Sequence, residues 1–233
     1  MSLSLATRFL FCIIKYKNKQ RVKTMVSVTR GRPPKYSRDD ALNKAMHVFW
    51  RNSYEGTSLD DLSKATGMNR PSLYNAFGDK ECLFWSAVEW YLTHEGSLTQ
   101  HWLASDGPVA ETFSKLLNGY IELFSQPDSG RGCMVVLGAI NCRPEHQHLS
   151  DKLSALRRST HAQATAFLQR AAARGELKAE AHPEALAEFF MAIFNGLSIQ
   201  ARDGSTPEQM HHIVEQASRL FESWTDNTSK HHD

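Results

Sequence analysis

The chain has 233 residues, of which 41% are hydrophobic and 22% charged, a composition typical of a globular protein with one or two domains. The apolar run at residues 10–14 is far shorter than the ~20 residues that a membrane span needs, so no membrane partner is expected. The four cysteines form no CxxC pair and have no zinc-ligand spacing. We therefore expect a cytoplasmic protein without a metal or a cofactor.

Positive charge is concentrated at the beginning of the chain. Residues 1–38 contain ten of the 27 Lys and Arg residues and no acidic residue, which leaves 17 basic and 25 acidic residues in the remainder. A basic segment before an acidic body fits a nucleic-acid contact at one end of the chain, although a solvated tail would have the same composition. We expect residues 1–24 to form a disordered leader and Met25 to be the natural start.

The basic segment ends in the sequence Arg-Gly-Arg-Pro-Pro-Lys at residues 30–35. Proline keeps such a segment extended and glycine keeps it thin, so Arg30 and Arg32 could lie in a narrow minor groove. The segment resembles the core of an AT-hook, and a plain linker is the alternative. We treat residues 1–35 as a flexible basic leader with a DNA-gripping arm.

A first helix is predicted to begin at Ser37, with Asp40 in the capping-box position. Its apolar residues recur at helical spacing, which favours a supporting helix that packs behind the next two. These residues are Leu42, Ala45, Met46 and Phe49.

Residues 57–80 predict two short helices joined by a tight turn. Thr57 is expected to cap the first helix, with Asp60 three residues later completing a capping box. Gly67 can adopt the left-handed conformation that the turn requires. Asn69 is a good N-cap for the second helix, and Pro71 falls in its first turn.

The second of these helices has two distinct faces. Leu73 and Phe77 are four residues apart and are expected to point into the fold. The other sides carry Arg, Ser, Tyr and Asn side chains, which can pair with guanine, adenine and phosphate in a major groove. A helix–turn–helix motif over residues 59–78 is therefore predicted, and an ordinary helical corner is the alternative.

Several short motifs between residues 37 and 84 carry a family resemblance. They are Thr57-Ser58-Leu59, Lys64-Ala65-Thr66-Gly67, Ser72-Leu73-Tyr74, Phe77-Gly78-Asp79-Lys80 and Leu83. Together they resemble the DNA-binding signature of TetR-family transcriptional regulators. The resemblance implies that Tyr74 and Lys80 hold DNA phosphate, and Ala76 stands where the family often has a phosphate-contacting His or Tyr. The residues predicted to contact DNA are Arg30, Arg32, Thr57, Arg70, Pro71, Ser72, Tyr74, Asn75 and Lys80.

The remainder of the chain, residues 85–226, shows only helical patterns. The fourth helix is expected to continue through Tyr91, and a further amphipathic helix is expected over residues 109–124. Residues 132–141 are apolar on all sides, which favours a buried helix, with a strand as the alternative. A long helix is expected to end at Gly175, and residues 227–233 form a polar tail.

The last two predicted helices, at residues 183–202 and 207–224, have wider apolar surfaces than one stripe requires. Pairing them with the same helices of a second copy would form a four-helix interface, and a monomeric core is the alternative. Residues 195–204 are also similar to that segment in many TetR-type proteins. The predicted dimer contacts are Phe190, Phe194, Leu197, Ala201, Ile213, Ala217 and Phe221.

Aromatic residues of this second region could line an apolar pocket for a small molecule, although most such residues simply form a core. His94, His101 or Asn118 could supply polar anchors. The predicted lining residues are Trp85, Tyr91, Trp102, Phe113, Tyr120, Phe124, Met134 and Phe167.

These patterns predict an all-α fold with a three-helix DNA-binding domain at residues 36–84 and an effector-binding and dimerisation domain at residues 85–226. The sequence lacks GxSxG, HExxH, a phosphate-binding loop and a dinucleotide fingerprint, so an enzyme is not predicted. We expect a homodimeric repressor that binds a palindromic double-stranded operator, associates with the nucleoid when bound, and is released by an unidentified small molecule. The alternative is an architectural DNA-binding protein without an effector.

Overall fold

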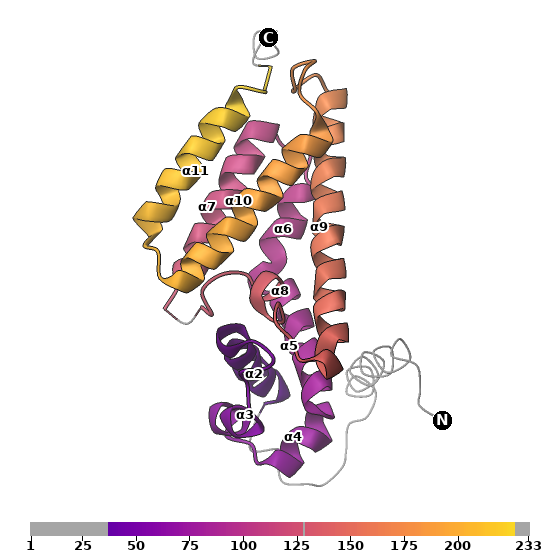
Figure 1. The fold of residues 1–233 in the computed structure, drawn as a ribbon, viewed down its shortest axis with the longest axis vertical. Coiled ribbons are helices and arrows are strands. Elements are labelled where there is room, and N and C mark those ends of the chain that lie inside the picture. The colour runs from indigo at the N-terminus through magenta and orange to yellow at the C-terminus, as the bar shows by residue number, and fades with distance from the viewer. Residues whose placement is uncertain (1–36, 128, 227–233) are drawn as a thin grey trace, which may run out of the picture. The chain divides into compact units, whose positions relative to one another are not determined.

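The computed structural model describes residues 37–127 and 129–226, and its regular elements there are all helices (Figure 1). The all-α prediction is confirmed. The described chain divides into two compact units, one ending at Thr93 and one beginning at His94. The arm with Arg30 and Arg32, the leader and the tail at residues 227–233 lie outside the described residues. None of the described helices is both long and apolar enough to cross a bilayer.

The described part of the first unit, residues 37–93, contains four helices. Helix α2 packs against α3 and α5, and α4 packs against both α3 and α5. Ser37 caps α2, because its hydroxyl accepts a hydrogen bond from the Asp40 backbone nitrogen at 3.5 Å. The predicted start of the first helix is therefore confirmed. The helices are α2 (Arg38–Asn52), α3 (Leu59–Thr66), α4 (Arg70–Phe77) and α5 (Lys80–Thr93).

An aromatic cluster forms the core of the first unit. Phe84 of α5 contacts Phe49 and Tyr54 edge-on, with ring centroids 5.2 and 5.1 Å away. Trp50 of α2 makes a similar contact with Tyr91 of α5 at 5.0 Å. Full burial of such side chains stabilises a fold by about 1.5–3 kcal/mol each. The cluster thus fixes α2 against α5 and provides a rigid base for the two shorter helices.

The second unit is a bundle in which α7 packs against α6, α10 and α11, while α9 packs against α6, α8 and α10 (Figure 1). Helices α7, α9, α10 and α11 confirm the helical patterns predicted for this region. The elements are η1 (Glu95–Ser97), α6 (Leu98–Leu103), α7 (Val109–Ser125), α8 (Met134–Leu137), η2 (Pro144–His146), α9 (Gln147–Ala173), α10 (Pro183–Asp203) and α11 (Pro207–Glu222).

The predicted buried helix at residues 132–141 is wrong in its length, because α8 contains only four residues. Gly132 has φ +84°, outside the helical region, and a Cβ atom there would overlap the backbone oxygen of Ser198 in α10. The segment instead packs its buried side chains from a single helical turn. Close backbone approach, rather than helix formation, explains the glycine.

Candidate nucleic-acid interface

Helix α3 is capped one residue later than predicted. The Ser58 hydroxyl accepts from the Asp61 nitrogen at 3.1 Å, and the Asp61 carboxylate accepts from the Ser58 nitrogen at 2.9 Å. Thr57 is buried, and its hydroxyl donates to the Ser53 carbonyl at 2.7 Å. The pattern of Ser or Thr followed by Asp three residues later occurs at two adjacent positions, Thr57 with Asp60 and Ser58 with Asp61. The sequence pattern therefore could not decide which residue is the cap. The Thr57 hydroxyl therefore bonds within the preceding turn instead of capping α3.

The Ser58 hydrogen bonds also affect the charge of the cap. They hold the pKa of the Asp61 carboxyl below its ordinary value, because each of them favours the ionised form. The carboxylate lies at the positive end of α3, where a negative charge is favourable. The beginning of α3 is thus fixed at neutral pH by an ionised capping box.

The turn between α3 and α4 has the predicted geometry. Gly67 adopts the left-handed conformation with φ 70° and ψ 7°, which ends α3 without a steric cost. The Asn69 side chain accepts from the Ser72 nitrogen at 2.9 Å and caps α4, with Pro71 in the first turn. These contacts confirm the predicted turn and hold α3 and α4 at a defined angle.

The two faces of α4 are separated as predicted. Leu73 and Phe77 are buried in the unit. Tyr74 is 45% exposed, and Asn75 is also exposed. Arg70 and Pro71 are exposed at the beginning of the helix, and Ser72 is half-buried. The structure therefore brings five of the predicted DNA contacts together on one short helix, which are Arg70, Pro71, Ser72, Tyr74 and Asn75.

Arg70 makes a contact that the sequence pattern did not predict. Its Nε and Nη2 atoms donate to Asp60 Oδ1 at 3.1 and 2.7 Å. Asp60 lies in the first turn of α3, ten positions earlier in the chain. The guanidinium group is therefore held at the exposed junction of α3 and α4.

The beginning of α5 is already occupied by a carboxylate from the chain. Asp79 Oδ1 accepts from the Cys82 nitrogen at 2.8 Å, so this helix start is capped by a side chain of the same unit. Lys80 is half-buried, and its ammonium group lies 4.2 Å from the centroid of the Tyr54 ring. Lys80 therefore adds a positive charge at a helix start where a carboxylate already caps the Cys82 nitrogen.

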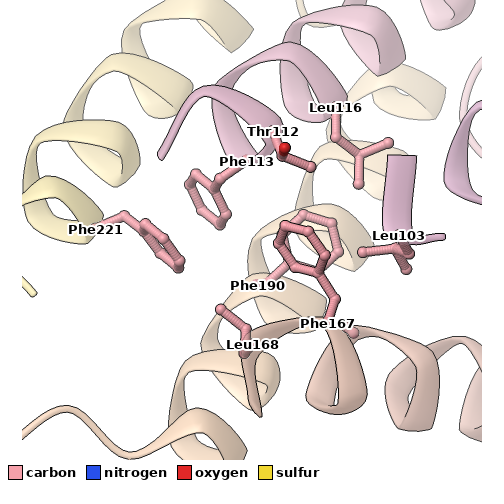
Figure 2. Close-up of a pocket in the computed structure, with 9 residues that line it drawn as sticks. Leu103, Thr112, Phe113, Leu116, Phe167, Leu168, Phe190 and Phe221 are labelled. Carbon is pink, nitrogen blue, oxygen red and sulfur yellow. The ribbon is translucent and has the colours of Figure 1, made fainter. Parts of the chain in front are cut away.

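A small apolar cavity lies inside the second unit, and Phe113 and Phe167 of the predicted pocket line it (Figure 2). The rings of Phe113 and Phe221 stack with centroids 4.1 Å apart, and Phe190 approaches Phe113 edge-on at 5.4 Å. The cavity volume is about 20 Å³, which is room for about one water molecule. The lining residues are Leu103, Thr112, Phe113, Leu116, Ala164, Phe167, Leu168, Phe190 and Phe221.

The other predicted pocket residues lie elsewhere. Trp85 and Tyr91 belong to the core of the first unit. Trp102 lies on α6, Met134 is buried in α8, and Phe124 stacks on Tyr120 of α7. Burial raises the pKa of Tyr120, whose hydroxyl is hydrogen-bonded to Thr99. None of the three proposed polar anchors, His94, His101 and Asn118, lines this cavity.

The predicted dimer contacts are mostly internal. Six of the seven are buried within the second unit and only Ile213 is partly exposed, so a partner could not reach the others without repacking. The exposed apolar side chains of α10 and α11 include Ile199 at 47% and Leu220 at 46%. A Cβ atom at Gly196 would have no neighbour within 4 Å in the described chain. The buried predicted residues are Phe190, Phe194, Leu197, Ala201, Ala217 and Phe221.

Both units match protein families. Residues 41–87 match the family described as bacterial regulatory proteins of the tetR family. Residues 110–217 match the family described as a tetracyclin repressor-like C-terminal domain. The first match covers α3 and α4 with the turn between them, and the second covers most of α7 through α11.

Individual relatives extend the likeness over most of the chain. The HTH-type transcriptional repressor ComR of Escherichia coli is 33% identical over 201 residues, covering 84% of this chain and 94% of ComR. The repressor BdcR of the same organism is 28% identical, covering 77% and 86%. A cysteine mutant of the TetR-family regulator CifR, solved in complex with 26-bp double-strand operator DNA, is 38% identical with a TM-score of 0.77. That likeness covers 83% of this chain and 100% of the CifR chain.

Proposed function

The chain belongs to the TetR family of transcriptional regulators, and from this premise we propose a homodimeric repressor that binds a palindromic operator and leaves it when a small molecule binds. The observation that carries the DNA-binding part is the exposed face of α4. It presents a guanidinium, an amide and a phenol from a helix whose buried face anchors it. We propose that this exposed face of α4 enters the major groove of the operator. The cytoplasm is the expected compartment.

The individual contacts follow from the chemistry of the side chains. Arg70 and Asn75 suit the edges of guanine and adenine, and the Tyr74 hydroxyl suits phosphate. We assign Lys80 to phosphate as well, because its charge lies at the beginning of α5, which follows α4 directly in the chain. Arg30 and Arg32 are proposed to follow the minor groove beside the half-site. We leave Thr57 out of the proposed interface because it is buried.

Pairing of two copies is proposed through the outer faces of α10 and α11. Ile199 and Leu220 would otherwise leave apolar side chains in water, and Gly196 would allow close approach of a second helix. A two-fold protein fits a palindrome whose half-sites are about 34–36 Å apart, one helical turn of DNA. The symmetry of the pair would then set the symmetry of the operator.

The effector is proposed to occupy the cavity between α7, α9, α10 and α11. Its wall is apolar apart from Thr112, so we expect an uncharged, mainly apolar small molecule. The present space is too small for such a compound, and its entry would have to move the surrounding helices. A compound that favours the expanded bundle can weaken DNA binding only if the DNA-bound dimer favours the compact one.

The test is a selection of bound fragments from the source genome, followed by binding measurements on the enriched sequence. A symmetric operator bound far more tightly than random DNA is expected. Thermal shift with uncharged aromatic and aliphatic compounds would identify ligands, which are then added to the complex with the operator. Ligands that leave operator affinity unchanged would favour the architectural alternative, and equal affinity for all duplexes would contradict the repressor.

A further inference from the structure

We propose that Asp60 is a specificity-determining residue that positions Arg70 to read a guanine in each operator half-site. The inference rests on the proposed function, because it refines how the same face of α4 recognises DNA. Its basis is the pair of hydrogen bonds from Arg70 Nε and Nη2 to Asp60 Oδ1, at 3.1 and 2.7 Å. The two residues come from different helices, so the contact depends on the angle set at Gly67.

The ion pair is poorly placed to stabilise the fold. The Arg70 and Asp60 side chains are 55% and 76% exposed, and exposed pairs contribute little because water screens them. Arg70 is also the first residue of α4, at the positive end of the helix, where a positive charge is unfavourable. Stability therefore gives no reason for an arginine at this position, whereas a base contact does.

The geometry leaves the useful part of the guanidinium unused. Arginine has five N–H donors, and Asp60 accepts from Nε and from one hydrogen of Nη2. Both hydrogens of Nη1 and the second hydrogen of Nη2 remain, and no other contact of these atoms is seen among the described residues. The Nη1 and Nη2 edge is the one that can donate two parallel hydrogen bonds to guanine O6 and N7. Asp60 thus holds the Nε side of the guanidinium group and leaves the Nη1 and Nη2 edge available to a base.

The carboxylate also acts against unspecific binding. Asp60 adds a negative charge to the surface that would meet DNA, where it repels phosphate regardless of the sequence. A guanine edge that is correctly paired with Arg70 compensates for that repulsion, but a wrong base does not. Discrimination would therefore come from an attractive contact and a repulsive one together.

The experiment measures fluorescence anisotropy of the selected operator, the operator with each guanine pair replaced, and random DNA. Wild-type protein should bind the operator about tenfold or more tightly than an operator in which one particular guanine pair is replaced. This is the discrimination expected of a bidentate hydrogen-bonded pair. Asp60→Ala should lose most of this preference and bind random DNA as well as wild type or better. Arg70→Lys should lose the same preference, since an ammonium group cannot form the fork.

Controls separate the possible failures. Asp39→Ala removes the same charge from an exposed position of α2 and should leave the preference unchanged. Circular dichroism should show the same helical content for all variants, and thermal unfolding should show that each is folded at the assay temperature. If wild type shows no preferred sequence, the proposed function fails. If Arg70→Ala loses the preference while Asp60→Ala keeps it, or if Asp60→Ala weakens every duplex equally, the positioning role is overturned.

Discussion

At the scale of single residues, exposure decides which side chains of α4 can act on DNA. Tyr74 and Asn75 project from the helix, while Leu73 and Phe77 hold it in the unit. This division follows from helical spacing and could be predicted from the sequence. The partner of Arg70 could not, because Asp60 lies on another helix and its approach depends on the turn between them.

Lys80 is the residue whose role on DNA is separable from its role in the fold. If it contacts phosphate, Lys80→Ala should weaken binding to all sequences and lower the slope of log K against log salt by about one unit. The same change removes the contact with the Tyr54 ring and should cost about 0.5–1 kcal/mol of stability, as cation–π contacts at exposed sites do.

Salt titrations of operator affinity and urea unfolding measure these two effects independently. Lys178→Ala, an exposed change in the second unit, is the matched control and should leave both unchanged. An unaltered salt slope in Lys80→Ala with reduced stability would assign Lys80 to the fold alone.

At the scale of elements, most helix ends follow from one or two local residues, although the cap of α3 lies one residue later than predicted. Ser37, Asn69 and Thr206 cap their helices through their own side chains, and Gly204 ends α10 in the left-handed conformation. These are local effects of one or two residues, so sequence carries them. Helix α6 was not predicted because it has only six residues, too few for a periodic pattern.

The capping box of α3 should make stability depend on pH in the acid range. The pKa of Asp61 is lowered in the folded state, so its contribution is complete above the unfolded value of about 4 and is lost as pH falls through the folded pKa. Asp61→Asn should therefore be less stable than wild type at pH 7, and the difference should shrink below about pH 4. Urea unfolding across pH tests this, and a difference that stays constant would exclude the ionised carboxylate as the cause.

Two glycines with left-handed backbones should respond differently to alanine. Gly175 has φ 75°, and a Cβ atom there would meet no atom within 4 Å, so Gly175→Ala should cost about 1 kcal/mol from backbone strain alone. Gly132 has a similar φ, but its Cβ would overlap the Ser198 backbone, so Gly132→Ala should cost more than Gly175→Ala. Chemical unfolding of both variants gives the comparison, and equal losses would mean that the α10 contact can relax.

At the scale of the whole molecule, the sequence could not identify which apolar face of α10 is internal. The helix has apolar residues on more than one side, and the packing of α7 and α9 decides which are buried. Phe190, Phe194 and Leu197 face that packing, whereas Ile199 remains exposed. Amphipathic patterns identify apolar surface but not its partner, and this is why six predicted dimer contacts proved to be core residues.

The exposed apolar surface makes the assembly testable. The double change Ile199→Glu with Leu220→Glu should place charges in the proposed dimer interface, where an unpaired buried charge is strongly unfavourable. We expect light scattering after size exclusion to give a dimer mass for wild type and a monomer mass for the variant. Both side chains are about half exposed in the single chain, so the monomer should keep its helical content and its unfolding cooperativity.

The matched control is Ile140→Glu, which changes an equally exposed isoleucine (49%) that belongs to neither α10 nor α11. It should leave the dimer mass unchanged. Since a palindrome is bound by two linked reading helices, the monomeric variant should lose far more affinity for the full operator than for a single half-site. If the double variant remains dimeric, the dimer interface lies elsewhere. A monomer that binds the full operator as tightly as wild type would show that dimerisation is not needed for operator binding.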